Sequence, residues 1–268
     1  ILFYMNVVND HIQELEQLLG YPLITTPLVI SGMAGSSIGM IQLPYKDVPF
    51  VVDGSDLITK TIQDEKYFNS LTLVISGAKT SEDVMRGEET QLVGCLQQRD
   101  GTGKQILVFT GTHSKHVAVE GDKVTSFKTY MTGEFFELLL KKSILSDSVE
   151  KGSGLVEERN RRSFNKGVAD SIESNLLHGS FLVRTNELFK KFTKEENYYY
   201  LSGLLIGTEV NELADLRYEK MILVTTSAMR PYYETSFDIL GMGKSMEICD
   251  ADQALIRGQF NILQQAMR

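Results

Sequence analysis

Two short segments of the 268-residue sequence carry the side chains best suited to chemistry. Arg86–Gln91 places two carboxylates beside an arginine at the expected start of a helix. Thr110–Lys115 follows an apolar run, 106–109, that reads as a buried strand. A turn of small and hydroxyl residues with a lysine can hold phosphate, because its backbone N–H groups and hydroxyls point at the anion and the lysine adds charge. A carboxylate placed shortly before such a turn indicates phosphoryl transfer to a hydroxyl group.

The elements that must position these side chains follow from the apolar spacing. We expect strands at 28–30, 71–75, 105–109 and 221–224, a hairpin about 120–122, and helices at 5–19, 88–98, 133–140, 164–176, 232–240 and from 253 onward. Thr132 is the expected N-cap of the helix at 133–140. Residues 146–163 are polar and charged and read as a mobile connection. Strands that alternate with helices indicate the α/β class.

The composition is that of an ordinary globular enzyme. The formal net charge of −8 argues against a nonspecific nucleic-acid binder, which needs a basic face. An anionic ligand would need local positive charge, for which Arg86, Lys115 and Arg184 are candidates. Cys95 and Cys249 lie far apart and make no metal-type spacing, and the sequence has no long apolar span. We therefore expect a cytoplasmic protein without membrane or nucleic-acid partners, and the sequence leaves the oligomeric state open.

Several segments taken together resemble the 2-dehydro-3-deoxygalactonokinases, which phosphorylate a 2-oxo-3-deoxy sugar acid with ATP. The matching segments run in the same order from about Ile30 to the C-terminus, and they are 31–36, 86–91, 110–115, 130–134 and 201–207. These kinases are similar to the actin, heat-shock ATPase and sugar kinase superfamily. The resemblance implies an α/β fold of two ribonuclease H-like domains, with ATP and the sugar in a central cleft.

One part of the family pattern is missing. Members open with a strand and an Asp-x-Gly-Thr-Thr-Asn type of turn, the first phosphate motif, whose aspartate works with the metal. The sequence has no such segment and begins at Ile1 rather than at methionine. We expect the first strand segment to be missing from this chain, which would then be part of a longer protein.

The resemblance also implies a division of labour. We expect an N-terminal sugar-acid-binding domain over residues 1–100, incomplete at its start, and a nucleotide-binding domain over 101–268. The last helix could pack back on the first domain. The strong turn chemistry of Asp100–Gly103 marks the boundary.

Glu88 is the predicted catalytic base. Gly87–Gly94 is similar to the Gly-Asp-Gln-Gln-Ala-Ala-Leu-x-Gly stretch of glycerol kinase-like enzymes, whose aspartate is the base. Glu88 stands at that aspartate's position, although this stretch is one residue shorter between its glycines. The simpler alternative is that Glu88 and Glu89 only stabilise a helix N-terminus, where negative charge is favoured. Lys115 is predicted to neutralise charge that develops on the transferring phosphate.

The predicted sugar-acid site combines charged residues with a glycine-rich loop. Arg86 could clamp the substrate carboxylate in a bidentate fork, or could pair with Glu89 or Asp83 as structure. The loop could bind a polyhydroxylated acid or could be a plain turn. The full predicted set is Ser31, Gly32, Met33, Gly35, Ser36, Arg86 and Glu89. Residues 35–39 also fit the Gly-x-Ser-x-Gly elbow of hydrolases, but that elbow needs a strand directly before it, so we treat this match as accidental.

The predicted nucleotide site has three parts. The second phosphate motif supplies Gly111, Thr112, His113 and Ser114. A run with two glycines four apart supplies Gly203 and Gly207, and the position of the adenosine motif supplies Thr226 and Ser227. The alternatives are a hairpin turn for the first part and helix packing for the two glycines. Sugar kinases often have two glycines where Thr225 and Thr226 stand, which leaves adenine contact open. Mg²⁺ is implied with ATP, but His113 and His116 without a third ligand make a weak metal site.

The combined expectation is an ATP-dependent kinase that phosphorylates the terminal hydroxyl of 2-dehydro-3-deoxy-D-galactonate in galactonate catabolism. One alternative is a kinase for another sugar acid. Another, of a different class, is a catalytically inactive sugar-binding or regulatory relative. The retained Glu88 and Lys115 favour an active enzyme, whereas the absent first phosphate motif favours the inactive relative.

Overall fold

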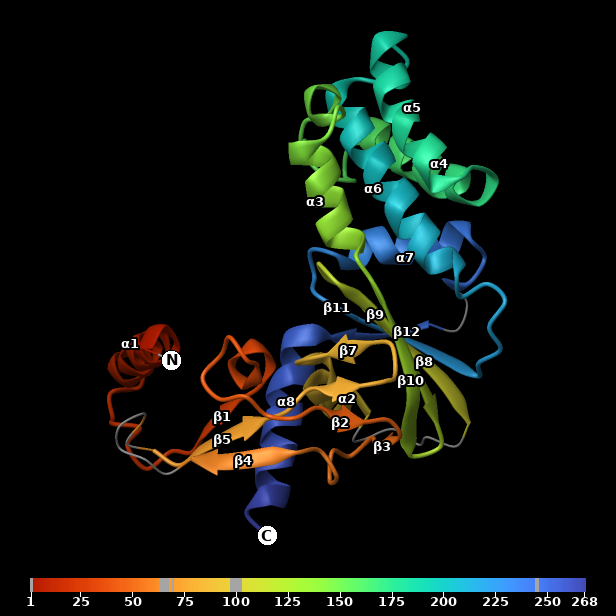
Figure 1. Cartoon of the computed structure of the whole chain (residues 1–268). Helices are drawn as coiled ribbons and strands as arrows, with labels where there is room; N and C mark the ends of the chain where they lie inside the picture. Colours follow the sequence, from red (N-terminus) through yellow and green to blue (C-terminus); the bar gives the residue numbers. More distant parts are fainter. Residues whose placement is uncertain (1, 63–67, 69, 97–102, 244–245) are drawn as a thin grey trace. The chain divides into compact units, whose positions relative to one another are not determined.

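The computed structural model describes residues 2–62, 68, 70–96, 103–243 and 246–268 (Figure 1). The chain forms two compact units. Unit 1 comprises Ile1–Gly103, Val117–Lys128 and Ala251–Arg268, and unit 2 comprises Lys104–His116 and Thr129–Asp250. The boundary expected at 100–103 falls mostly on residues 97–102, which lie outside the described residues.

Unit 1 is built on short strands. Its bounds are α1 (Leu2–Leu19), β1 (Leu28–Ile30), η1 (Gly32–Gly35), β2 (Lys46–Asp47), β3 (Phe50–Val51), β4 (Thr59–Ile62), β5 (Thr72–Ile75), β6 (Ala78–Lys79), β7 (Val84–Met85), α2 (Glu88–Leu96) and α8 (Ala251–Ala266). Strand β5 lies between β1, which is parallel to it, and β4, which is antiparallel. Strands β2, β6 and β7 form a second small sheet. The hairpin expected about 120–122 connects β9 (Ser114–Glu120) to β10 (Lys123–Tyr130), and β10 pairs with β3.

Helices α2 and α8 of unit 1 touch backbone to backbone. A Cβ placed on Gly94 of α2 would lie 1.9 Å from the carbonyl oxygen of Ala254, and a Cβ on Gly258 of α8 would lie 1.8 Å from that of Thr90. Both distances are far inside van der Waals contact, so only glycine fits at either position. The helix that begins at Glu88 is therefore fixed in place by a segment far along the chain.

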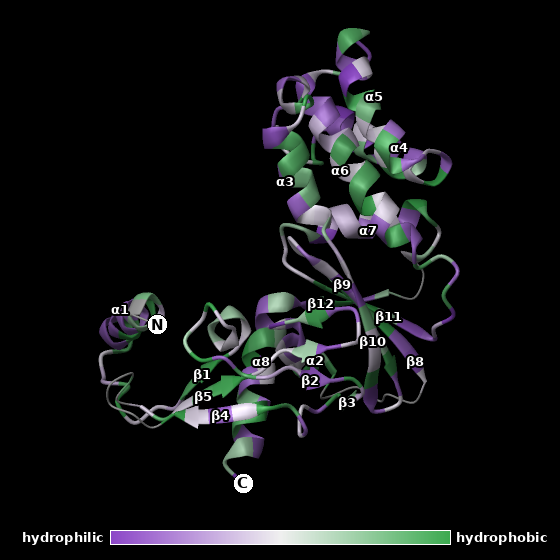
Figure 2. Ribbon diagram, in the orientation of Figure 1, coloured by the Kyte–Doolittle hydropathy of each residue, from purple (hydrophilic) through white to green (hydrophobic). Residues whose placement is uncertain are grey.

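Unit 2 contains a parallel sheet and a group of helices. Strand β11 (Lys220–Thr225) is parallel to β8 (Lys104–Phe109) on one side and to β12 (Met246–Asp250) on the other. The remaining bounds are α3 (Thr132–Lys142), η2 (Ser146–Ser148), α4 (Glu158–Glu173), α5 (Leu176–Leu188), α6 (Lys194–Asn211) and α7 (Arg230–Ile239). Figure 1 shows α3, α4, α5 and α6 gathered together. Figure 2 shows hydrophobic and hydrophilic residues mixed along α3, α4 and α5. In α3 and α4 the two kinds of residue lie on different faces, as expected of amphipathic helices.

The sequence located most elements, with shifts of a few residues at their ends. The apolar runs became β1, β5, β8 and β11, and the mixed α/β class is confirmed. The helix expected at 88–98 begins at Glu88, and its last two expected residues lie outside the described residues.

Three local predictions were wrong. Thr132 is the first residue of α3 rather than its N-cap, because its hydroxyl bonds to Glu209 instead of to the helix's own backbone. Residues 158–163 of the expected mobile connection belong to α4. The helix expected at 164–176 ends at Glu173, since Asn175 caps the next helix by accepting the N–H of Leu177 at 2.9 Å.

Candidate active site

The glycine-rich loop of unit 1 leaves β1 as a single 3-10 turn. Gly32 has a φ of +78°, a left-handed conformation that favours glycine. Ser31 accepts a hydrogen bond from Gln259 of α8, with 3.2 Å between Oγ and Nε2, and Ser36 donates to the carbonyl of Met33 at 2.7 Å. Gly35 and Ser36 are buried, whereas Met33 is half exposed. The loop is therefore held by its own hydrogen bonds and by α8.

Arg86 connects this loop to the start of α2. Its Nη1 donates to the carbonyl oxygen of Gly35, and its guanidinium carbon lies 4.2 Å from the ring centroid of Tyr45. The structural pairing with Glu89 that the sequence allowed is absent, because the Glu89 carboxylate accepts from Gly87 instead. In the described residues the Arg86 side chain donates to Gly35 alone, which leaves most of its N–H groups for another acceptor.

The two adjacent carboxylates have different surroundings. Glu88 is half-buried, and its Oε2 accepts the backbone N–H of Arg86 at 2.9 Å. Glu89 is fully buried and accepts the N–H of Gly87 with both oxygens, at 3.0 and 2.8 Å, and the hydroxyl of Thr90 at 3.0 Å. Glu88 is thus the carboxylate that a ligand can reach, and a direct sugar contact by Glu89 has no exposed surface to use.

Burial and the neighbouring charge act on Glu89 together. Burial first, and then the negative charge of Glu88, raise the pKa of Glu89 from 4.5 to about 7. The hydrogen bonds from Gly87 and Thr90 lower that pKa and so oppose the shift in part. Gly87 has a φ of +114°, so the chain reverses at a glycine and presents its N–H to the Glu89 carboxylate.

In unit 2 the predicted phosphate turn lies between β8 and β9. Gly111, Thr112 and His113 are exposed. The backbone N–H groups of Gly133 and Glu134, at the start of α3, both donate to the carbonyl of Thr112 at 3.1 Å. A Cβ on Gly133 would lie 2.7 Å from the Cα of Thr112, so the close approach of α3 requires glycine there. The segment 130–134 therefore supports the turn, which explains why these two distant motifs occur together.

Ser114 and Lys115 differ from the rest of the turn, since both are buried. The Lys115 ammonium donates to the carbonyl of His113 at 2.9 Å, and the Ser114 hydroxyl lies 2.9 Å from that of Tyr233. His113 is exposed and pairs with Glu134 through Nε2. Of the predicted phosphate contacts, Gly111, Thr112 and His113 are thus accessible to a ligand, whereas Ser114 is not.

The predicted adenosine segment lies at the same sheet edge as this turn. Strands β8 and β11 are parallel neighbours, so their carboxyl ends meet there. The hydroxyls of Thr110 and Thr225 are 2.8 Å apart and join the two strand ends. Thr226 and Ser227 follow β11 and are exposed. One edge of the sheet thus brings the two segments together.

Gly203 and Gly207 have a different role from the one predicted. A Cβ on Gly203 would lie 2.1 Å from the carbonyl oxygen of Phe164, and one on Gly207 would lie 3.0 Å from the Cα of Val168. Both glycines of α6 therefore face the backbone of α4 in close packing. This is the helix-packing alternative, and it leaves no room for a nucleotide on that face.

The comparisons with known proteins bear on these two groups of residues. A model of the 2-keto-3-deoxy-galactonokinase family matches residues 5–262. The chain belongs to the 2-keto-3-deoxy-galactonokinase family. Membership makes it a sugar-acid kinase by class, a phosphotransferase with an alcohol group as acceptor, and it confirms the resemblance seen in the sequence.

Individual relatives agree with this family. The chain is 31% identical over 224 residues to the 2-dehydro-3-deoxygalactonokinase of Escherichia coli (strain K12), covering 81% of this chain and 72% of that protein. It is 30% identical over 237 residues to a provisionally named 2-dehydro-3-deoxygalactonokinase of Rhizobium meliloti (strain 1021), covering 87% and 76%. A crystal structure from Sinorhizobium meliloti with the same provisional name matches with a TM-score of 0.82 and 27% identity, over 97% of this chain and 83% of that one.

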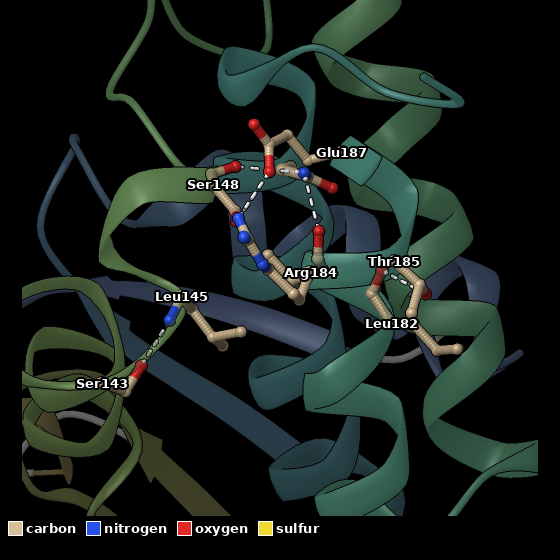
Figure 3. Close-up of polar contacts among 9 residues, drawn as sticks. Ser143, Leu145, Ser148, Leu182, Arg184, Thr185 and Glu187 are labelled. Carbon is tan, nitrogen blue, oxygen red and sulfur yellow. Dashed lines mark hydrogen bonds and ion pairs between the residues drawn. The ribbon is translucent and has the colours of Figure 1, made fainter. Parts of the chain in front are cut away.

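Arg184 is not free to serve a family ligand in the way the charge balance suggested. Its Nη1 donates to the hydroxyl of Ser148 at 3.1 Å and to the carboxylate of Glu187 at 2.8 Å (Figure 3). Glu187 also accepts from Ser148. These contacts tie α5 to η2, so the positive charge of Arg184 is used within the helical part of unit 2.

Membership of the kinase family implies ATP as a substrate, whereas the Mg²⁺ expected from the sequence stays a prediction. Among the described residues, no three or more His, Cys, Asp or Glu side chains lie together in a way that could hold a metal ion. We therefore assign no residue to Mg²⁺. As for the membrane, every helix of the described chain is too short or too polar to cross one.

Sequence reasoning missed a group of residues in unit 2, in which the buried Glu209, Tyr233 and His116 meet the half-buried Thr132. Its members come from different elements, so no local sequence motif predicts that they lie together. One signal was available: Glu209 is a charged residue within the apolar stretch that follows Leu204. A charge at such a position has to find buried partners.

Proposed function

We propose that this protein transfers the γ-phosphate of ATP to the terminal hydroxyl of 2-dehydro-3-deoxy-D-galactonate, as a step of galactonate catabolism. Family membership supplies the reaction class and the substrate type. The observation that carries the residue assignment is the position of Glu88. Its half-buried carboxylate stands at the start of α2, next to Arg86 and the loop at 31–36.

Glu88 acts as the general base. An ionised Glu88 accepts the proton of the attacking hydroxyl while the oxygen bonds to the γ-phosphorus and the bond to the β-phosphate oxygen breaks, releasing ADP. The N–H of Arg86 at 2.9 Å orients the carboxylate.

Arg86 binds the carboxylate of the sugar acid. Its contact with Gly35 uses Nη1, and the face of its guanidinium rests on Tyr45. The guanidinium is therefore held in one orientation, with further N–H groups available for a bidentate pair with a carboxylate. The loop residues Ser31, Gly32 and Met33 stand beside this group and bind the hydroxylated chain of the sugar.

Unit 2 binds ATP at the edge formed by β8 and β11, and unit 1 binds the sugar acid. Amide groups of Gly111–His113 and the hydroxyl of Thr112 contact the phosphates, and Thr226 and Ser227 contact the nucleoside side. Lys115 is buried beneath the turn, where its positive charge acts on the phosphates electrostatically and without direct contact. The parallel strands β8, β11 and β12 support a ribonuclease H-like fold for unit 2.

The test uses protein expressed from its complete gene. ADP release is measured with 2-dehydro-3-deoxy-D-galactonate and, in parallel, with its C4 epimer. We expect turnover with the first substrate, and a Glu88→Gln variant that loses about 10²–10⁴-fold in kcat, which is the usual contribution of a general base. Glu82→Gln is the matched control, because Glu82 is an exposed carboxylate of the same unit.

Three outcomes separate the alternatives. A Glu88→Gln enzyme with unchanged kcat rejects Glu88 as the base. Faster turnover of the C4 epimer assigns the protein to another sugar acid. Binding of the sugar acid in calorimetry without any phosphate transfer identifies a catalytically inactive relative.

A further inference from the structure

A buried carboxylate in unit 2 has no part in the chemistry described so far. Glu209 of α6 is 3% exposed. Its Oε1 lies 3.2 Å from Nε2 of His116, and its Oε2 accepts from the hydroxyls of Thr132 and of Tyr233, the latter at 2.9 Å. The partners come from β9, α3 and α7, so one carboxylate joins four elements.

The direction of each hydrogen bond follows from what the groups can donate. A carboxylate without a proton only accepts, so His116, Thr132 and Tyr233 all donate to Glu209. Burial, and then the negative charge of Glu209, raise the pKa of Tyr233 well above its usual value, so Tyr233 keeps its proton. That single proton is used on Glu209. The hydroxyl of Ser114 lies 2.9 Å from the Tyr233 oxygen and 3.4 Å from the carbonyl oxygen of Gly111, and it is therefore the donor at the shorter of these two contacts.

This chain of bonds fixes both sides of the exposed turn Gly111–His113. On one side, the Tyr233 hydroxyl bonds both to Glu209 and to Ser114, and Ser114 is the residue at which the turn enters β9. On the other side, Glu209 holds Thr132, whose neighbours Gly133 and Glu134 donate to the carbonyl of Thr112. The turn has exposed amides, and its two supports end on the same carboxylate.

We propose that Glu209 is a positioning residue for the phosphate turn. It sets the geometry of Gly111–His113 through Tyr233, Ser114 and Thr132 without touching a ligand. A corollary is that the Ser114 hydroxyl is a support and not a phosphate contact, since it is buried and its contacts go to Tyr233 and to the carbonyl of Gly111. The inference rests on the proposed binding of ATP at this turn.

The main test compares Glu209→Ala with Glu209→Gln. Alanine leaves the buried donors of His116 and Tyr233 and the half-buried hydroxyl of Thr132 without this acceptor, so the turn loses its supports. Glutamine keeps an oxygen for Thr132 and Tyr233, and its amide can donate to His116 in the other tautomer. We expect Glu209→Ala to lower kcat/KM for ATP by about 10²-fold, the loss typical of a misplaced group. Glu209→Gln should restore most of it.

Two further measurements separate positioning from general damage. The dissociation constant of the sugar acid, measured by calorimetry without nucleotide, should change by less than about twofold in either variant. Hydrogen exchange of the amides at 110–115 and 130–134 should be faster in Glu209→Ala than in the wild type, without ATP present. Loss of global structure would instead raise exchange throughout unit 2.

Tyr233→Phe provides a milder variant if Glu209→Ala does not fold. It removes the hydroxyl that connects Glu209 to Ser114 and should therefore lower kcat/KM for ATP, as Glu209→Ala does. Tyr232→Phe is the matched control, because this neighbouring hydroxyl makes no hydrogen bond within the described residues. The inference is overturned if the wild type is active and both variants, Glu209→Ala and Tyr233→Phe, have the ATP kinetics of the wild type. Hydrogen exchange in the turn would then also stay as slow as in the wild type. A wild type without ATP-dependent turnover contradicts the proposed function instead.

Discussion

Glu88 and Glu89 show how neighbouring identical side chains acquire different roles. The helix period turns Glu89 inward, where Gly87 and Thr90 surround its carboxylate, while Glu88 stays at the surface of the helix start. Identity and spacing alone could not separate them, since both are acidic residues at a helix N-terminus. Burial separates them, because Glu89 is fully buried whereas Glu88 is half-buried, and this burial raises the pKa of Glu89 to about 7.

The raised pKa of Glu89 predicts how stability depends on pH. The folded chain holds the Glu89 proton more tightly than the unfolded chain between pH 4.5 and about 7, so the free energy of unfolding falls as pH rises through that window and then levels off. The full effect is on the order of 3 kcal/mol. Glu89→Gln should remove this slope, as measured by urea unfolding from about pH 5 to about pH 8.

Glu82→Gln serves as the control for this prediction, because Glu82 is exposed and should leave the slope unchanged. If wild type and Glu89→Gln lose stability equally over the same pH range, Glu89 is not the group that titrates.

Arg86 gives a second prediction at the residue scale. Arg86→Lys can still donate to Gly35 but loses the planar fork, so we expect KM for the sugar acid to rise by about ten- to hundredfold, with a smaller change in kcat. Steady-state kinetics at saturating ATP measure both constants. An analogue with an alcohol in place of the carboxylate should bind the wild type and the variant equally. If the wild type instead bound that analogue more tightly than the variant does, Arg86 would not be the residue that binds the carboxylate.

Among the elements, α2 and α8 depend on glycine for their contact. A Cβ at Gly258 would meet the Thr90 carbonyl at 1.8 Å, and backbone cannot move aside cheaply. We therefore expect Gly258→Ala to destabilise unit 1 by about 3 kcal/mol, at the upper end of overpacking costs. Thermal or urea unfolding measures the loss. Gln264→Ala, an exposed change in the same helix, should stay within about 0.5 kcal/mol.

That prediction fails if Gly258→Ala is as stable as the control, in which case the two helices would have to sit further apart than the structure shows. A related point concerns α4 and α6, where Gly203 and Gly207 allow the same kind of contact. Glycines four apart fit a ligand site or a helix crossing equally well in a sequence, and only the neighbouring helix decides between them.

For the whole molecule, the sequence predicted what depends on continuous apolar runs and on local turn chemistry. The strands at 28–30 and 106–109 and the helix start at Glu88 are of this kind. Groups assembled from distant positions escaped it. Glu209 meets His116 across 93 residues and Thr132 across 77, and no spacing rule connects them. Arg184 looked available as a cation, although its ion-pair partner Glu187 stands three residues later in the same helix; only the contact with Ser148 required the three-dimensional structure.

The packing of α8 on α2 also bears on how the chain is made. Gln91 of α2 donates to the carbonyl of Ala251, 160 residues later, and all of unit 2 is encoded between these two positions. While a ribosome synthesises residues 129–250, the glycine face of α2 is without its partner. Unit 2 can therefore fold during translation before unit 1 does. The helix that bears Glu88 would then gain its contact with α8 only after unit 2 has been synthesised.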